Sequence, residues 1–444
     1  MSYKNKDRKT GNLFKELMPF GGRLNENNRW IKLSELVPWK ELEEIYRKYF
    51  SQLGRPGKDS QLINGLLIVK HLQVLSDERV VEEFLENPYV QYFCGYDQFV
   101  RDGEIESSTL SKIRKRLGVE YFKKFEWELI EVLKNKKIIK SNEQMIDATV
   151  FPVNITYPTD TGLIEKARDW VVKNIKLIIK VVGIKEKVRT YCRKAKTTYL
   201  KFQKKRKRTM KEIYKVNKQM LQYLRRNIFQ LKVIIEKSRD IPGRLLKKTR
   251  ERLEVAERIY AQQIEMLKNK THRVKDRIVS FHRPHIRPIV RGKSGKEVEF
   301  GPKAVLSYVD GFAFLDEISF DAFNESTILS KDIKIHESRF DKLPEIVITD
   351  NIYGTRENRR ILKEENIRAS FMPLGRRQKE STGFLDIKWI KKKQRRRNRI
   401  EGIIGNSKTN YGLDKILYKI VGGEEIWVRM GLMAMNLSTA LAKV

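Results

Sequence analysis

The sequence predicts an α/β protein: a mixed sheet with flanking helices, preceded by an all-helical amino-terminal domain and interrupted by a helical hairpin insertion. Three observations predict this arrangement. Apolar residues recur at helical spacing up to about Ile139, strand signals begin at Gln144 and vanish between residues 161 and 280, and they return after His282. We therefore expect a helical domain over residues 1–139, a sheet domain over 140–160 and 281–444, and an insertion over 161–280.

The amino-terminal domain contains a short basic helix for which two roles are considered. Hydroxyl side chains from Ser107 to Thr109 are expected to cap a helix that Gly118 ends. This helix either reads DNA as the recognition helix of a helix-turn-helix, or it is an ordinary surface helix with solvated cations. The candidate DNA-binding residues on it are Lys112, Arg114, Lys115 and Arg116.

Strand and helix signals then alternate along the sheet domain and its insertion. β-branched and apolar residues from Gln144 to Val153 predict a buried strand. In the insertion, apolar stripes on both sides of Pro242 predict an antiparallel helical hairpin, which either contacts DNA or pairs two subunits. The remaining expected elements are an antiparallel meander of strands 286–290, 298–300, 304–309 and 312–320 with turns at 292–295 and 310–311, a strand-helix-strand unit over 345–373, and a basic helix over 389–408.

Charge composition indicates the partner. The 444 residues include 93 Lys and Arg against 56 Asp and Glu, a formal charge of +37. Solubility needs only a few net charges, so we expect a polyanion, and basic surface interleaved with aromatic residues favours nucleic acid over a membrane. Cys94 and Cys192 are far apart and predict neither a disulfide framework nor a zinc site. Without a long apolar run, the chain is expected to be soluble and cytoplasmic, with no membrane partner.

Three acids are candidates for catalysis. Asp147 lies inside an apolar strand and Asp350 closes another, so each carboxylate requires a cation, a proton or a partner to offset desolvation. Arg397, Glu401 and Lys408 fall on one face of a helix. An ordinary ion pair between Arg397 and Glu401 on a solvated helix is the competing interpretation of that face.

These segments together resemble the Asp-Asp-Glu (DDE) transposases of bacterial insertion sequences, whose catalytic core has the ribonuclease H fold, and more narrowly the insertion-sequence-five group. The resemblance spans most of the chain and includes the stretch from Glu299 to Lys303. That group has the signature Tyr-xx-Arg-xxx-Glu-xxxxxx-Lys. Here Arg397, Glu401 and Lys408 match it, and Gln394 stands where the signature has tyrosine.

The resemblance implies a site built from three distant segments. Asp147 is expected on the first, central strand, Asp350 just after the fourth, and Glu401 on a later helix, where they bind two Mg²⁺ ions, with Mn²⁺ as a substitute. Arg397 and Lys408 are assigned to DNA. The other cations of this helix are expected on the phosphate backbone: Lys391, Lys392, Lys393, Arg395, Arg396 and Arg399.

The implied function is cleavage at transposon ends and transfer of the 3′-hydroxyl into target DNA, with double-stranded DNA as partner and a homodimer on paired ends. Two alternatives remain open: a nuclease or resolvase of the same fold, and a non-enzymatic basic protein that bridges DNA. Asp310 and Glu380 are reserve candidates for Asp147 and Glu401. Neither the lysine-containing turn at 292–295 nor the histidine pair at 282 and 285 predicts a nucleotide or metal site.

Overall fold

The computed structural model describes residues 24–444 except 52, 55, 101, 102, 104, 187, 239, 291–297, 322 and 375–381, and for 382–386 it describes the backbone alone. The chain divides into two compact units. One unit takes in the chain up to Asn154 and from Pro302 onward, and the other is Ile155–Gly301. The second unit contains more residues at both ends than the expected insertion of 161–280.

The amino-terminal part of the first unit is helical, as predicted. Gly118 interrupts its last helix with a φ of 66° and a ψ of −178°, so the expected end of the short basic helix is confirmed. The expected hydroxyl cap is wrong, because the residue before the helix is Glu106 and no side chain caps it. The helices are α1 (Arg29–Ser34), α2 (Trp39–Arg47), α3 (Ser60–Leu72), α4 (Asp77–Glu86), α5 (Pro88–Phe93) and α6 (Ser107–Asn135).

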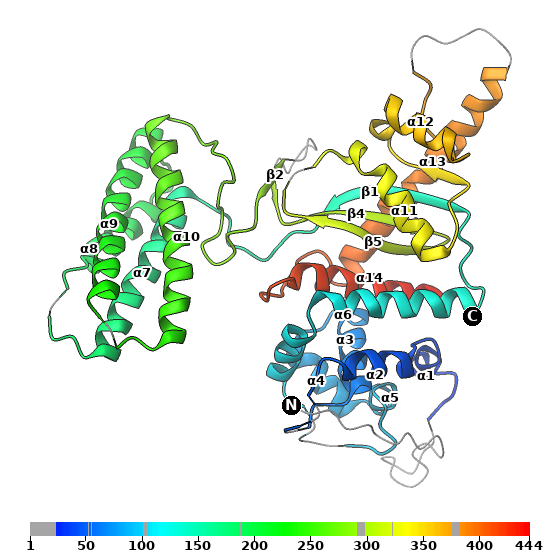
Figure 1. Cartoon of the computed structure of the whole chain (residues 1–444), viewed down its shortest axis with the longest axis horizontal. Coiled ribbons are helices and arrows are strands. Elements are labelled where there is room, and N and C mark those ends of the chain that lie inside the picture. Colours follow the sequence, from blue (N-terminus) through cyan, green and yellow to red (C-terminus); the bar gives the residue numbers. More distant parts are fainter. Residues whose placement is uncertain are drawn as a thin grey trace. The chain divides into compact units, whose positions relative to one another are not determined.

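A five-stranded mixed sheet follows, with the strand order β5-β4-β1-β6-β7. Figure 1 labels β1, β4 and β5 of this sheet. The central strand β1 pairs antiparallel with β4 and parallel with β6, and β6 pairs parallel with β7. The mixed sheet is confirmed, and its topology is consistent with a ribonuclease H-like core. The strands are β1 (Glu143–Val150), β4 (Lys303–Val309), β5 (Phe312–Ser319), β6 (Ile346–Ile348) and β7 (Arg368–Ala369).

Helices pack on the sheet and join it to the amino-terminal helices. Ile146, Val305 and Val347 from three strands form a core with Ile333 of α11 and Leu362 of α12. Helix α14 contacts β5 as well as α3 and α6, and the side chain of its Asn436 exchanges hydrogen bonds with the backbone of Ala313. The elements are η2 (Glu325–Thr327), α11 (Leu329–Phe340), η3 (Asn351–Tyr353), α12 (Arg356–Glu364), α13 (Thr382–Asn410) and α14 (Gly423–Leu441).

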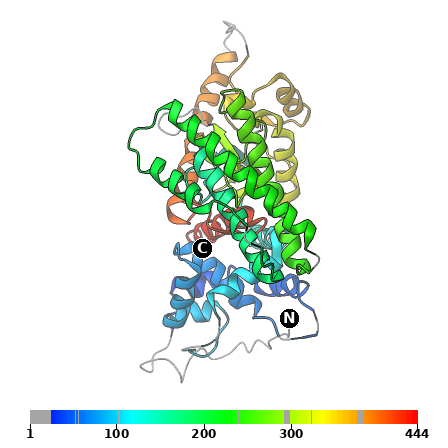
Figure 2. The ribbon, with the colours of Figure 1, turned by 90° about the vertical axis from the view of Figure 1, so that its left-hand side faces the viewer.

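The second unit is a helical bundle with a small hairpin (Figures 1 and 2). The predicted pair α9 and α10 forms, broken before Gly243 as expected. Helix α7 packs against both, and Ile175, Leu224 and Ile259 bring all three into one core. The elements are α7 (Asp160–Val182), α8 (Cys192–Gln203), α9 (Met210–Lys237), α10 (Gly243–Lys268), β2 (Pro288–Val290) and β3 (Val298–Phe300).

The predicted single meander is wrong. Strands β2 and β3 pair only with each other, whereas β4 pairs with β1 and β5. The reason is that β1, although it is distant in sequence, pairs with β4 over seven residues, whereas β3 is only three residues long and could form fewer backbone hydrogen bonds with β4. The expected turn at 292–295 lies outside the described residues. In the described part of the chain, no helix is long and apolar enough to cross a membrane.

Candidate active site

Asp147 lies on β1, and Asp350 lies just beyond the end of the neighbouring parallel strand β6. Met145 of β1 is paired with Ile348, the last residue of β6, and each aspartate lies two residues further along the chain. The parallel pairing therefore leads towards both aspartates, with Asp147 inside β1 and Asp350 in the segment that follows β6. Asp350 also starts η3, where its carboxylate accepts a 2.6 Å hydrogen bond from the Asn351 amide.

The environment of Asp147 favours a cation. Its side chain is only 18% exposed, and one carboxylate oxygen accepts a 2.9 Å hydrogen bond from the amide of Ala148. Burial raises the pKa of Asp147 above its usual range, the negative charges of Glu325 and Glu401 raise it further, and Arg397 opposes them. Additional positive charge at this position would stabilise the ionised carboxylate.

Arg397 is the cation that lies between two of the predicted catalytic acids. Its guanidinium is 3.9 Å from a carboxylate oxygen of Asp147 and 3.7 Å from one of Glu401, four residues later on α13. The Glu401 side chain is 54% exposed, against 19% for Arg397. The structure thus links Asp147 to Glu401 through a guanidinium. Among the described residues, no three His, Cys, Asp or Glu side chains are grouped so that they could hold a metal ion.

Two further residues at this site were missed by the sequence analysis. Glu325, in η2, influences the pKa of Asp147 and forms a 2.7 Å ion pair with Lys303. Tyr353 is fully buried, and its hydroxyl has no hydrogen-bond partner among the described residues. Burial raises the pKa of Tyr353, and so do nearby carboxylates that include those of Asp147 and Asp350. The tyrosine is therefore buried beside both aspartates.

Gln394 connects α13 to the strand ends beside Asp350. Its amide nitrogen donates hydrogen bonds to the carbonyl oxygens of Thr349 at 2.9 Å and Ser370 at 2.8 Å. It also approaches the Ser370 hydroxyl at 3.0 Å. The residue that departs from the expected tyrosine therefore holds the helix of Glu401 against the ends of β6 and β7.

Several cations that were expected on DNA lie against the sheet. Lys408 donates hydrogen bonds to the Thr149 hydroxyl at 3.1 Å and to the Val150 carbonyl at 2.9 Å, which anchors α13 to the end of β1. Lys393 and Arg396 form ion pairs with Glu143 at the start of the same strand. These three side chains tie the helix to the central strand. Of the α13 cations predicted to contact DNA, those that are exposed are Lys391, Lys392, Arg395 and Arg399.

Arg114 does not fit the expected DNA-binding role. It is buried, forms an ion pair with Asp77, and its guanidinium lies 4.1 Å from the ring centre of Tyr418. Lys70 forms a second, 3.0 Å ion pair with Asp77. Position 114 shares a helix face with buried apolar residues, so its cation faces the interior. The other three predicted cations of this helix, Lys112, Lys115 and Arg116, are exposed.

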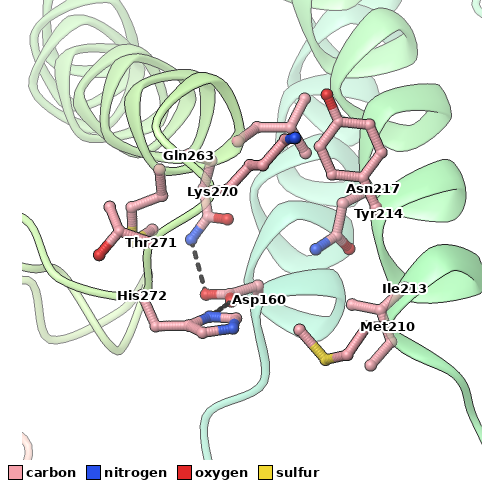
Figure 3. A pocket seen from close by; sticks show the side chains of 11 residues that line it. Asp160, Met210, Ile213, Tyr214, Asn217, Gln263, Lys270, Thr271 and His272 are labelled. Atoms are coloured by element: carbon pink, nitrogen blue, oxygen red, sulfur yellow. Dashed lines mark hydrogen bonds and ion pairs between the residues drawn. The ribbon is translucent and has the colours of Figure 1, made fainter.

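The reserve candidates do not replace the predicted acids. Asp310 occupies a turn with a φ of 46°, accepts a 2.9 Å hydrogen bond from the Lys140 amide, and adjoins the start of β1 rather than Asp147. Glu380 lies outside the described residues. The insertion unit has a pocket of about 220 Å³, in which the side-chain amide of Gln263 donates a 3.0 Å hydrogen bond to the carboxylate of Asp160 (Figure 3). Asp160 also forms a 2.8 Å ion pair with Arg277.

Two family models that match this chain both describe transposase domains. The family model described as "Transposase domain (DUF772)" matches residues 19–116, and the model described as "Transposase DDE domain" matches residues 347–438. The chain is similar to the uncharacterized protein ORF8 in the nfe locus of Rhizobium meliloti, with 33% identity over 156 residues, which cover 34% of this chain and 75% of that protein. No solved structure matches significantly. Asp350 and Glu401 fall within the second match, and Asp147 lies outside it.

Proposed function

The chain belongs to the DDE transposases of insertion sequences, and from this premise we propose that Asp147, Asp350 and Glu401 are its catalytic acids. The proposed reaction is metal-dependent cleavage at the ends of the element, followed by transfer of the liberated 3′-hydroxyl into target DNA. We further propose an assignment to the insertion-sequence-five group, supported by Arg397, Glu401 and Lys408 at the spacing of its signature.

The observation that carries the proposal is the register of Asp147 and Asp350. Met145 pairs with Ile348, and each aspartate follows its paired residue by two positions, so two residues that are 203 positions apart in the sequence follow the same paired position of β1 and β6. Carboxylates that lie close to each other repel, and burial already raises the pKa of Asp147. We propose that these two carboxylates and that of Glu401 on α13 act together as oxygen ligands for divalent cations.

The donor set fits magnesium. Carboxylate oxygens suit Mg²⁺, with Mn²⁺ as a substitute, and the neighbourhood of Asp147 already accommodates one positive group, the Arg397 guanidinium. Asp147 and Asp350 would hold the first ion, and Glu401 would complete the site for a pair. When bound, two ions would supply activation of water or a 3′-hydroxyl and stabilisation of the leaving oxygen.

Arg397 has a second role in this proposal. Its guanidinium contacts Asp147 and Glu401 through long ion pairs of 3.9 and 3.7 Å, which are easily exchanged for stronger contacts. With the two carboxylates engaged by bound cations, the guanidinium of Arg397 would be free to bind a phosphate of the DNA backbone as a planar fork. Lys408 stays on β1, where it keeps the strand end next to Asp147 in place.

The proposed DNA contacts are the predicted cations that are exposed. On α13 these are Lys391, Lys392, Arg395 and Arg399, and residues 391, 395 and 399 follow one another at four-residue spacing along one face. On α6 they are Lys112, Lys115 and Arg116, at the end of the amino-terminal family match. We propose that two copies of the chain act together on paired ends in the bacterial cytoplasm.

The decisive experiment is strand joining. The protein is incubated with Mg²⁺, a supercoiled plasmid and a precleaved end of its element that carries a free 3′-hydroxyl. Joined product is expected from the natural chain and none from Asp350→Ala, while Asp321→Ala, at an exposed aspartate after β5, joins normally. Plasmid nicking without joining would favour a nuclease or resolvase, and joining by Asp350→Ala would overturn the assignment of the triad.

A further inference from the structure

The positive charge of the chain is concentrated in the insertion unit. Residues 155–301 contain 41 Lys and Arg against 14 Asp and Glu, a net charge of +27 out of the total of +37. The other 297 residues, which include every predicted catalytic acid, account for only +10. A surface built to bind a polyanion is therefore expected on the bundle as well as on the sheet unit.

One face of α9 carries a continuous basic stripe. Lys211, Lys215, Lys218, Gln222, Arg225, Phe229 and Lys232 follow one another at alternating four- and three-residue spacing, and all seven are exposed. At 100° per residue they fall within one sector of the helix. This α9 stripe contains five cations and no acid, and the aromatic ring of Phe229 is 68% exposed within it.

The cations of the α9 stripe are available to a partner. Within the described part of the chain, no ion pair or hydrogen bond engages the side chains of Lys211, Lys215, Lys218 or Arg225, whereas Lys232 pairs with Glu257 of α10. The opposite face of α9 is buried against α7 and α10 through residues such as Leu224. The bundle therefore holds the stripe in a fixed position, with little ordering left to occur on binding.

The exposed charged residues of α10 provide a comparison for the α9 stripe within the same bundle. The exposed surface of α10 combines six cations with three acids, so that part of the charge is compensated within the helix. The α9 stripe differs from this surface because its five cations lie on one helix face with no acid among them. The exposed charged residues of α10 are Arg244, Lys247, Lys248, Arg250, Glu251, Glu254, Arg258, Glu265 and Lys268.

We propose that the α9 stripe binds the phosphate backbone of double-stranded DNA. From Lys211 to Lys232 it runs about 32 Å at 1.5 Å per residue, which is close to one turn of duplex DNA, about 34 Å. Two copies of the stripe would repel each other, so DNA fits it better than a second copy of this chain does. The inference shares its DNA partner with the proposed function but does not depend on the catalytic acids.

The test compares two quadruple variants with the same loss of charge. One replaces the stripe cations, Lys211→Ala, Lys215→Ala, Lys218→Ala and Arg225→Ala, and the control replaces Arg244, Lys247, Lys248 and Arg250 of α10 by Ala. Duplex affinity is measured from 50 to 300 mM salt. The stripe variant is expected to bind at least about tenfold more weakly and to lower the slope of log K against log [salt] by about 3, while the control keeps the natural slope.

The outcomes separate this inference from the proposed function. If both variants are folded by circular dichroism and show equal slopes of log K against log [salt], the stripe is not a DNA-binding surface. A stripe variant that loses dimer formation or RNA affinity but keeps its duplex affinity would exclude the proposal as well. Strand joining fails in Asp350→Ala without a change of salt slope if both proposals hold. A natural chain that never joins ends but shows the stripe effect would refute the proposed chemistry and leave the stripe intact.

Discussion

The side-chain amide of Gln394 donates a 2.9 Å hydrogen bond to the main-chain carbonyl of Thr349, the residue immediately before Asp350. The second bond, to the carbonyl of Ser370, reaches the end of the neighbouring strand. An amide has two N–H donors, whereas the tyrosine of the family signature has a single O–H. Gln394 therefore positions Asp350 in a way that a tyrosine at this place could reproduce only in part.

Replacing Gln394 tests this positioning role. In Gln394→Ala, the carbonyls of Thr349 and Ser370 lose their shared donor, so the free energy of unfolding should fall by about 1–3 kcal/mol. Strand joining at saturating DNA should slow by about tenfold or more, because the catalytic geometry loosens, while DNA affinity stays the same. Asn398→Ala, at an exposed amide on the same helix, is the control. Kinetics of Gln394→Ala that match the control would exclude a positioning role.

Arg397 competes with cations for Asp147 and Glu401 in our proposal, so its removal should affect metal binding and catalysis in opposite directions. Arg397→Ala is expected to bind Mn²⁺ about tenfold more tightly in the absence of DNA, as measured by electron paramagnetic resonance, because a positive charge within 4 Å of both acids is lost. Strand joining should decrease. Arg396→Ala, which removes a cation from Glu143 instead, is the matched control. Weaker Mn²⁺ binding in Arg397→Ala would contradict the proposal.

Asp332 of α11 predicts a pH dependence of stability. Its side chain is fully buried without hydrogen-bond partners for either oxygen among the described residues, and burial together with the charges of Asp316 and Glu317 raises its pKa to about 9. The folded state thus keeps a proton that the unfolded state releases above its usual pKa near 3.8. The stabilising contribution is complete below pH 4 and is lost progressively as the pH rises towards 9.

Asp332→Asn preserves the shape of the neutral acid and cannot ionise. Its melting temperature should exceed that of the natural chain by an amount that grows between pH 4 and pH 9, as followed by thermal unfolding in a pH series. Asp321→Asn, at an exposed position, should show no such growth. A pH-independent difference between Asp332→Asn and the natural chain would show that residue 332 is already charged in the folded state.

Local patterns were sufficient to predict the elements that carry the acids. The apolar run around Asp147 predicted β1, the run ending at Asp350 predicted β6, and Pro242 located the break between α9 and α10. Each of these depends on interactions within a few residues. The register between β1 and β6 does not, because it is set by packing between segments about 200 positions apart, and only the family resemblance placed the two aspartates together.

Interactions over long sequence separations account for the errors. Glu325 lies in the short helix η2, which no sequence pattern predicted, and its proximity to Asp147 follows from the fold alone. Lys393 was assigned to DNA as part of a basic run and Lys408 from the family signature, but neither pattern reveals which cations contact β1. Arg114 did carry a local signal: with Leu110 and Leu117 it lies on the buried face of its helix.

The buried ion pair of Arg114 with Asp77 yields the last prediction. In Arg114→Ala the carboxylate of Asp77 keeps only Lys70 as an ion-pair partner in this cluster, so the free energy of unfolding should fall by about 3 kcal/mol or more. Lys115→Ala, at the exposed neighbouring position, should leave stability within about 0.5 kcal/mol and instead reduce the salt slope of DNA binding by about 0.9. Denaturant unfolding and DNA titration of both variants measure the two effects. If Arg114→Ala were as stable as the natural chain and lost DNA affinity like Lys115→Ala, the arginine would have to leave the interior to bind DNA, and its structural role would be refuted.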